Sequence, residues 1–181
     1  ATWPRFRPSD FRKGKEHGLA PDWPIAYEDL SPFYDSTDAL MGVSGALGDP
    51  AIPPRGPFQT RPLPPTPVGR VTAKGFEKLG WHYWPMPCAI LSEDWQGRPA
   101  CSGCGACQSG CPTGALNNTA VTIWPRALAA GCELRTGARV EQVETGPDGR
   151  ATGVVYLDRN SGVRHRQEAK IVVVACNGVG T

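Results

Sequence analysis

The chain has 181 residues, enough for one ordinary domain with a sizeable core. Its formal charge of +2 arises from mixed signs, which gives no support for binding to nucleic acid or to a membrane surface. No apolar run approaches the roughly 20 residues that span a bilayer, and 22 Gly with 19 Pro is a high proportion for a self-sufficient globular domain.

Both ends of the sequence read as cuts through a larger protein. The start, Ala1–Arg5, has no initiator Met and lacks the apolar segment of a signal peptide. The end, Val172–Thr181, reads as a strand that runs into a Gly-rich turn, and such a turn normally leads into another element. We therefore expect an internal fragment of a longer chain.

The first part of the chain predicts one helix between two irregular segments. Residues 1–32 lack helical or strand periodicity, so we expect an irregular stretch whose aromatic side chains pack on a larger body. A helix is predicted to begin at Ser31-Pro32, with Ser as N-cap, and to end at Gly42 or Gly45. Residues 46–68 contain eight prolines, which predict an extended loop.

A second helix and a short strand follow. The pattern predicts a helix over Val68–Leu79, with Gly80 as its C-cap. Trp81–Trp84 then reads as a short strand, ended by the prolines at 85 and 87.

A cysteine-rich loop is expected at 97–118, before another helical pattern at Ala120–Ala130. Pro125 conflicts with one uninterrupted helix there. Either the helix is kinked at this proline, or it begins at Trp124 with Pro125 in its first turn.

The last fifty residues predict a β-meander. Turn residues at 146–149 and 158–162 separate alternating or apolar runs, and the last run is apolar throughout. The expected strands are Glu133–Thr136, Arg139–Thr145, Ala151–Leu157, Val163–Ala169 and a buried strand at Lys170–Ala175. With the helices upstream, this is a mixed α/β fold.

Four of the seven cysteines fall within eleven residues, as Cys-x2-Cys-x2-Cys-x3-Cys followed by Pro112. They are Cys101, Cys104, Cys107 and Cys111. An odd cysteine count and this close spacing disfavour a disulfide framework. Three interpretations stay open: an iron–sulfur cluster, a structural zinc ion, or reduced thiols that pack a tight loop. A single run excludes a two-cluster ferredoxin.

The order of the motifs resembles the glucose–methanol–choline (GMC) family of FAD-dependent oxidoreductases, in its bacterial choline-dehydrogenase-like and gluconate-dehydrogenase-like branch. The residues that carry the resemblance are Asp22-Trp23-Pro24-Ile25, Tyr27-Glu28-Asp29-Leu30, Cys104-Gly105-Ala106-Cys107, Trp124–Gly131, Leu134–Val143, Arg150–Tyr156 and Val172–Gly178. It implies part of an FAD-binding domain with a C-terminal meander, and Pro-rich segments that belong to a substrate domain.

The resemblance also implies a division of the chain and a reaction. Residues 1–100 would cross between the FAD-binding and substrate domains, 101–118 would form the Cys-rich loop, and 119–181 would complete the FAD-binding domain. The reaction would be hydride transfer from the CH–OH group of an alcohol or sugar to flavin. The family's Gly-x-Gly-x-x-Gly motif and C-terminal catalytic His have no counterpart in this sequence, so no catalytic residue is assigned and activity from this piece alone is not expected.

The cofactor contacts that the resemblance implies lie in three places. The backbone of Val140 would meet the adenine edge of FAD. The turn Ala175, Cys176, Asn177 and Gly178 would approach the same cofactor, since small residues let a backbone come close to a ligand. Asn117 and Asn118 would lie near the flavin, although helix capping explains them equally well.

The resemblance bears on electron transfer as well. Some sugar dehydrogenases of the family carry an iron–sulfur cluster that relays electrons from flavin to a cytochrome, with a different cysteine spacing, and others carry a similar loop without a cluster. A cytochrome subunit is therefore one partner that the resemblance implies. The rival interpretation is a small iron–sulfur electron-transfer module, in which the four cysteines would be the ligands.

Overall fold

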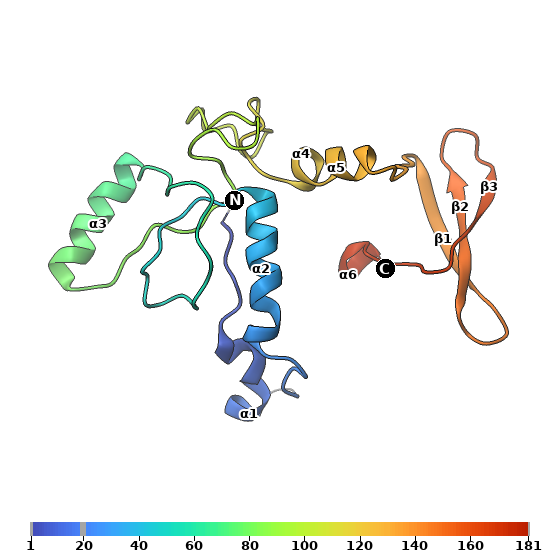
Figure 1. Cartoon of the computed structure of the whole chain (residues 1–181), viewed down its shortest axis with the longest axis horizontal. Helices are drawn as coiled ribbons and strands as arrows, with labels where there is room; N and C mark the ends of the chain where they lie inside the picture. The colour runs from blue at the N-terminus through green and yellow to red at the C-terminus, as the bar shows by residue number, and fades with distance from the viewer. Residues whose placement is uncertain (1, 19–20, 181) are drawn as a thin grey trace. The chain divides into compact units, whose positions relative to one another are not determined.

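The computed structural model describes residues 2–18 and 21–180, so that Ala1 and Thr181, the two ends of the sequence, lie outside the described residues. Contacts divide the chain into two compact units, Ala1–Ala130 and Gly131–Thr181, and each is described by itself (Figure 1). The first unit contains the 3-10 helix η1 (Pro8–Arg12) and the helices α1 (Lys13–His17), α2 (Tyr27–Met41), α3 (Pro67–Leu79), α4 (Thr119–Thr122) and α5 (Trp124–Ala129).

Helix α2 begins four residues before the predicted Ser31, at Tyr27. The backbone N–H of Ala26 donates to the Asp29 carboxylate at 2.8 Å, so an acidic side chain in the first turn caps this end instead of Ser31. Pro32 lies inside the helix, where it lacks one backbone donor. The predicted end is confirmed, because Gly42 takes the left-handed φ of 76° as C-cap. The irregular stretch predicted for 1–32 is also partly wrong, since η1 and α1 lie within it.

The core of the first unit lies where three extended segments run beside one another. Ser44 forms bridges with Cys88 and with Thr60, and Cys88 forms one with Thr2. Between these bridges the side chains of Val43 and Leu91 are fully buried. The strand-like pairing is limited to single bridges, because the many prolines in these segments lack backbone donors.

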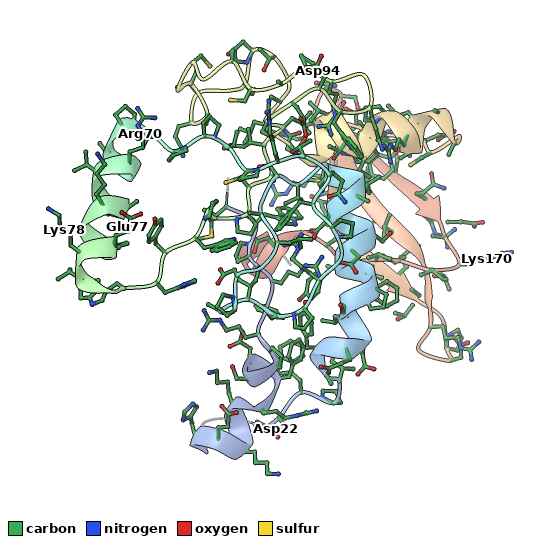
Figure 2. All side chains as sticks on the ribbon, turned by 60° about the vertical axis from the view of Figure 1, so that its left-hand side comes forward. Asp22, Arg70, Glu77, Lys78, Asp94 and Lys170 are labelled. Atoms are coloured by element: carbon green, nitrogen blue, oxygen red, sulfur yellow. The ribbon has the colours of Figure 1, made fainter. Side chains whose placement is uncertain are left out.

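Helix α3 is confirmed almost as predicted, with Thr66 as N-cap and Gly80 as left-handed C-cap. None of its side chains is buried, and Arg70 and Lys78 are exposed along it (Figure 2). The strand predicted at Trp81–Trp84 is wrong: the segment is extended but pairs with no described strand. Its first N–H, on Trp81, instead closes the turn after α3 by donating to the Phe76 carbonyl at 2.9 Å.

The helical pattern at 120–130 forms two short helices, α4 and α5, that meet at Ile123. Pro125 lies in the first turn of α5, where a proline removes no helical hydrogen bond. This agrees with the second of the two predicted arrangements. In the part of the chain that the structure describes, no helix has the length and apolarity needed to cross a bilayer.

The second unit is an antiparallel sheet in the order β1-β2-β3, followed by the short helix α6 (Asn177–Gly180). Its strands are β1 (Ala138–Thr145), β2 (Ala151–Asp158) and β3 (Arg164–Glu168), as the meander prediction placed them. A register shift between Val140 and Gln142 marks a bulge in β1. On one face, Glu141 accepts a 2.8 Å hydrogen bond from Arg164, so charged pairs cover this small sheet.

Two strands predicted in this unit are wrong. Glu133–Thr136 and Lys170–Ala175 form no strand in the described structure. The second of these segments is apolar yet open to solvent, with Ile171 and Val173 each 81% exposed. A strand needs a hydrogen-bonded neighbour, and an apolar pattern alone does not supply one.

Candidate functional site

The Cys-rich loop is anchored at both ends to the segment 89–91. The N–H of Cys101 donates to the Leu91 carbonyl at 2.9 Å, and the N–H of Asn117 donates to the Ala89 carbonyl at 2.9 Å. Between these anchors the glycines at 103, 105, 110 and 114 all have positive φ, so the backbone turns repeatedly without building a helix or strand. The loop therefore leaves the segment 89–91 and returns to it, and its two ends are held by backbone hydrogen bonds.

The four cysteines of this loop do not form a metal site. Among residues 2–18 and 21–180, no three His, Cys, Asp or Glu side chains stand close enough together to hold a metal ion. Cys104 and Cys107 are exposed, whereas Cys101 and Cys111 are half-buried at the base of the loop. The predicted set of iron–sulfur ligands, Cys101, Cys104, Cys107 and Cys111, is therefore not gathered into a metal site in the described chain. In this arrangement the four thiols do not fit a cluster.

Cys111 has a distinct environment within the loop. Its Sγ lies 3.5 Å from the Thr113 hydroxyl and accepts the backbone N–H of Leu116 at 3.3 Å. These hydrogen bonds, that of Thr113 first, lower the pKa of the Cys111 thiol to about 7. By contrast, burial raises the pKa of Cys88.

Asn117 joins three segments from a buried position. Its amide Nδ2 donates to the Gly42 carbonyl at 3.2 Å, and its Oδ1 accepts from Arg98. Arg98 also donates to the Met41 carbonyl at 3.0 Å, at the end of α2. Burial, with the neighbouring Arg126 charge, lowers the pKa of Arg98. The Asn117 side chain thus fixes the end of α2 against the start of α4. The proximity of Asn117 to the flavin stays a prediction.

Asn118 is the N-cap of α4. Its Oδ1 accepts the backbone N–H groups of Ala120, at 2.9 Å, and Val121, at 3.3 Å. The side chain is used as a cap while the residue stays exposed, so the capping function expected from the sequence is confirmed. A flavin contact from this position is not tested by the geometry of the chain.

Val140 lies on the outer strand of the three-stranded sheet. Its partner in β2 is Tyr156, and β1 has no described strand on its other side. Its side chain is 54% exposed, so Val140 is not a core residue in this unit. An edge strand directs alternate backbone N–H and C=O groups outward, where they are available to a ligand.

Ala175–Gly178 is an exposed turn that enters α6. Asn177 has a φ of 69°, the left-handed region that only a few non-glycine residues enter, and its Oδ1 accepts the N–H of Gly178 at 2.6 Å. A Cβ added at Gly178 would have no atom within 4 Å. Within the described chain, the space beside this backbone is therefore open.

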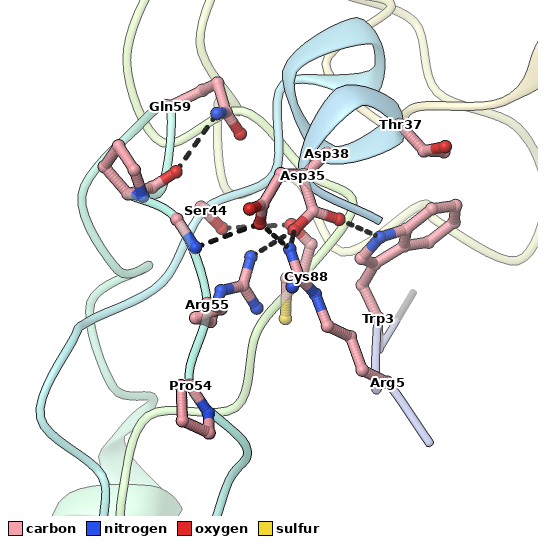
Figure 3. A network of polar contacts seen from close by, with 12 residues as sticks. Trp3, Arg5, Asp35, Thr37, Asp38, Ser44, Pro54, Arg55, Gln59 and Cys88 are labelled. Carbon is pink, nitrogen blue, oxygen red and sulfur yellow. Dashed lines mark hydrogen bonds and ion pairs between the residues drawn. The ribbon is translucent and has the colours of Figure 1, made fainter. Parts of the chain in front are cut away.

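A buried ion-pair network around Asp38 of α2 was not anticipated from the sequence (Figure 3). Asp38 is 1% exposed, and its Oδ1 accepts the indole N–H of Trp3 at 2.7 Å. Its Oδ2 accepts from Arg5 Nη2 at 2.5 Å and from Arg55. Three segments far apart in sequence thus meet at one carboxylate.

The same network continues to Asp35, one turn earlier on α2. Its Oδ1 accepts from Arg5 Nη2 at 2.6 Å and from the backbone N–H of Gly56 at 2.9 Å. Burial alone would raise the pKa of Asp35, but the hydrogen bond from Arg5, followed by that from Gly56, holds it below its ordinary value. Burial likewise opposes the charge of Arg5, yet its hydrogen bonds to Asp38, Tyr27 and Asp35 raise its pKa. The hydrogen bonds from Arg5 and Gly56 thus favour the ionised form of Asp35.

A signal for this network existed in the sequence. Tyr27, Tyr34 and Met41 recur at intervals of seven along α2, and Asp38 falls within the same stripe. A carboxylate on the apolar side of a helix needs a cationic partner, which Arg5 and Arg55 supply. The partners themselves were not readable, because they lie 33 and 17 residues away.

Comparison with known proteins identifies the family. The protein-family model described as GMC oxidoreductase matches residues 25–181 of this chain. The chain is 50% identical to 2-methyl-1,2-propanediol dehydrogenase of Mycolicibacterium austroafricanum, over 99% of this chain and 33% of that protein. It is 37% identical to 6'''-hydroxyparomomycin C oxidase of Streptomyces lividus, over 97% and 33%. It is 32% identical to the fructose dehydrogenase large subunit of Gluconobacter japonicus, over 100% and 33%.

The chain spans about a third of the length of these curated relatives. The family match covers well over half of the residues, and it includes the Cys-rich loop, the meander and the closing turn. The motif order that suggested the resemblance is therefore confirmed, and this chain belongs to the GMC oxidoreductase family.

Proposed function

We propose that the chain is part of an FAD-dependent dehydrogenase that removes a hydride from the CH–OH group of an alcohol or sugar. The observation that carries this proposal is the 50% identity, along nearly the whole chain, to a relative named as a diol dehydrogenase. The other two relatives, named as a hydroxyparomomycin oxidase and a fructose dehydrogenase subunit, are also oxidoreductases by name.

Two exposed stretches of the second unit fit the dinucleotide part of FAD. The outer edge of β1, the strand that contains Val140, would offer backbone donors and acceptors, and an adenine edge needs one of each. The open backbone at Gly178 would permit close approach of the cofactor. Bound FAD would supply the hydride acceptor of the reaction.

The roles of this chain's residues follow from those two stretches. Val140 would hold the adenine through its backbone, and Ala175–Gly178 would lie along the cofactor. Asn118, exposed at the start of α4, would lie near the flavin. Asn117, which is buried and hydrogen-bonded on both sides of its amide, would act as a positioning residue for the same turn.

An electron-accepting partner is part of the proposal. The fructose dehydrogenase relative is named as a large subunit, so that protein contains at least one further subunit. A cytochrome subunit that reoxidises the flavin is the partner we propose for the full-length enzyme, with an alcohol or sugar as its substrate.

The proposal is tested on the full-length protein. It should purify with the flavin absorbance near about 450 nm, which should bleach when a vicinal diol is added without oxygen. A protein that binds FAD without reduction by any diol or sugar would contradict the substrate class. A colourless protein that takes up no FAD would contradict the cofactor.

Single substitutions test the two FAD stretches. Val140→Pro removes one backbone donor at a sheet edge, and we expect it to weaken FAD binding, whereas Val140→Ile keeps the donor and should retain FAD. Gly178→Val adds a side chain where no atom of the described chain lies within 4 Å of the new Cβ. If this variant folds normally but loses FAD, the cofactor lies against the backbone at Gly178. FAD content equal to wild type in both Val140→Pro and Gly178→Val would contradict these assignments.

A further inference from the structure

A cavity of about 310 Å³ lies within the first unit, between the N-terminal segment, the Pro-rich loop and the segment after α3. Its volume is at the lower end of the roughly 300–1,000 Å³ typical of small-molecule sites. It is separate from every residue that the family resemblance assigns to FAD, since its lining comes from residues 3–7, 49–55 and 82–87.

Two buried arginines line this cavity. Arg5 and Arg55 both line it with side chains only 4% exposed. Their Nη groups pair with the aspartates of α2, but the buried Nε of each has no hydrogen-bond partner among the described residues. A buried donor without an acceptor is unfavourable, and a small rotation of either guanidinium toward a ligand oxygen in the cavity would give this donor an acceptor.

The rim adds further positive charge. Arg7 lines the cavity and its guanidinium makes no ion pair in the part of the chain that the structure describes. The acidic residue in the lining, Asp49, is already engaged: its Oδ1 lies 2.8 Å from His82 Nε2 and accepts the N–H of Ala51 at 2.9 Å. The lining therefore favours an anionic group over a cation.

The rest of the cavity lining is mostly apolar. Trp84 and Met86 belong to it and are 39% and 58% exposed, and Trp3 and Ile52 also contribute. Exposed aromatic and thioether surface beside a group of donors is typical of sites for a ligand with an apolar body and one polar end. Inorganic phosphate would satisfy the donors but leave this apolar surface uncovered.

We propose that the cavity binds a small organic acid, with its carboxylate toward Arg5, Arg7 and Arg55 and its apolar body against Trp84 and Met86. The lining of this site shares no residue with the FAD stretches. Whatever ligand the flavin reaction uses, the carboxylate site would add a second, acid-specific binding event to the protein.

The test is calorimetric titration of the full-length protein with benzoate, benzamide, inorganic phosphate and glucose. Benzoate should bind at millimolar concentration or better, and benzamide, which has the same shape without the charge, should bind about tenfold more weakly or not at all. Equal binding of benzamide and benzoate, preference for phosphate or glucose, or no binding of benzoate would each overturn the proposal.

Variants place the binding in this cavity. Arg7→Gln removes an exposed charge of the rim and should weaken benzoate binding about tenfold, whereas Lys78→Gln, an equally exposed cation on α3, should have no effect. Ile52→Trp should block binding by filling the cavity without changing its charge. If Arg7→Gln and Ile52→Trp, both folded by circular dichroism, bind benzoate as wild type does, the site lies elsewhere and the proposal is wrong.

Discussion

The indole N–H of Trp3 donates a 2.7 Å hydrogen bond to Oδ1 of Asp38, across 35 residues of sequence. The other oxygen of this carboxylate accepts from Arg5 and Arg55. Asp38 is therefore the point at which the N-terminal segment, α2 and the Pro-rich loop are held together. The extended segments of the first unit pair only by single bridges in the described residues, so the hydrogen bonds to this buried carboxylate help to hold these segments together.

Asp38→Asn should destabilise the protein by about 3 kcal/mol or more, because removal of one partner leaves buried guanidinium groups without their counter-charge. The measurement is the free energy of unfolding by urea titration. Ser36→Ala, on the exposed side of the same helix, is the matched control and should change that free energy by less than about 0.5 kcal/mol. If the two variants were equally stable, the network would not support the fold.

Asp35 predicts a loss of stability in acid. Burial would raise its pKa, but the hydrogen bonds from Arg5 and Gly56 lower it below its ordinary value of 3.8 in the folded protein. A carboxyl with a depressed folded pKa contributes stability above its unfolded pKa, about 4, and that contribution is lost as pH falls through the folded value. Unfolding followed from pH 7 to about pH 2 should show this decline, and Asp35→Asn should make the decline shallower. An unchanged slope in the variant would contradict the assignment.

Gly45 and Gly75 should respond to alanine in opposite directions. A Cβ at Gly45 would clash with the Phe58 ring, and the Arg55 guanidinium lies over the same ring, 3.6 Å from its centroid. Gly45→Ala should therefore cost about 1–3 kcal/mol through overpacking. Gly75 lies within α3 with nothing within 4 Å of an added Cβ, so Gly75→Ala should stabilise the helix by about 0.5–1 kcal/mol. Urea titration of both variants measures the two changes in the free energy of unfolding. Destabilisation by Gly75→Ala would contradict the conclusion that the helix surface at Gly75 is open.

The sequence predicted correctly those helix ends and strands that are determined by residues close to them in the chain. Gly42 and Gly80 end their helices as expected, and the three strands of the meander were found because turn residues separate them. The start of α2 was misplaced by one competing local contact, since Asp29 caps Ala26 ahead of Ser31. The expected strand at Lys170–Ala175 failed for another reason: its pairing depends on a neighbour, which no pattern within the segment specifies.

In the candidate site as well, local features could be predicted from the sequence and long-range contacts could not. The cap at Asn118 was readable because a cap acts within four residues. The Asp38 network and the cavity beside it were not, since their members come from segments that only the folded chain brings together. The cysteine spacing left an iron–sulfur cluster open beside zinc and reduced thiols, because spacing does not fix the direction of each thiol, and in the described chain the thiols are not gathered into a metal site.

Cys111 should be the more reactive thiol at neutral pH when compared with Cys88. Hydrogen bonds, first from Thr113 and then from the Leu116 backbone, lower its pKa to about 7, so its alkylation rate by iodoacetamide should rise through pH 7 and level off above it. Thr113→Val should move that inflection upward, toward the ordinary thiol value of about 8.5, while Ser109→Ala in the same loop should not. Peptide mass spectrometry resolves the two sites. An inflection that stays near 7 in Thr113→Val would show that the hydroxyl does not stabilise the thiolate.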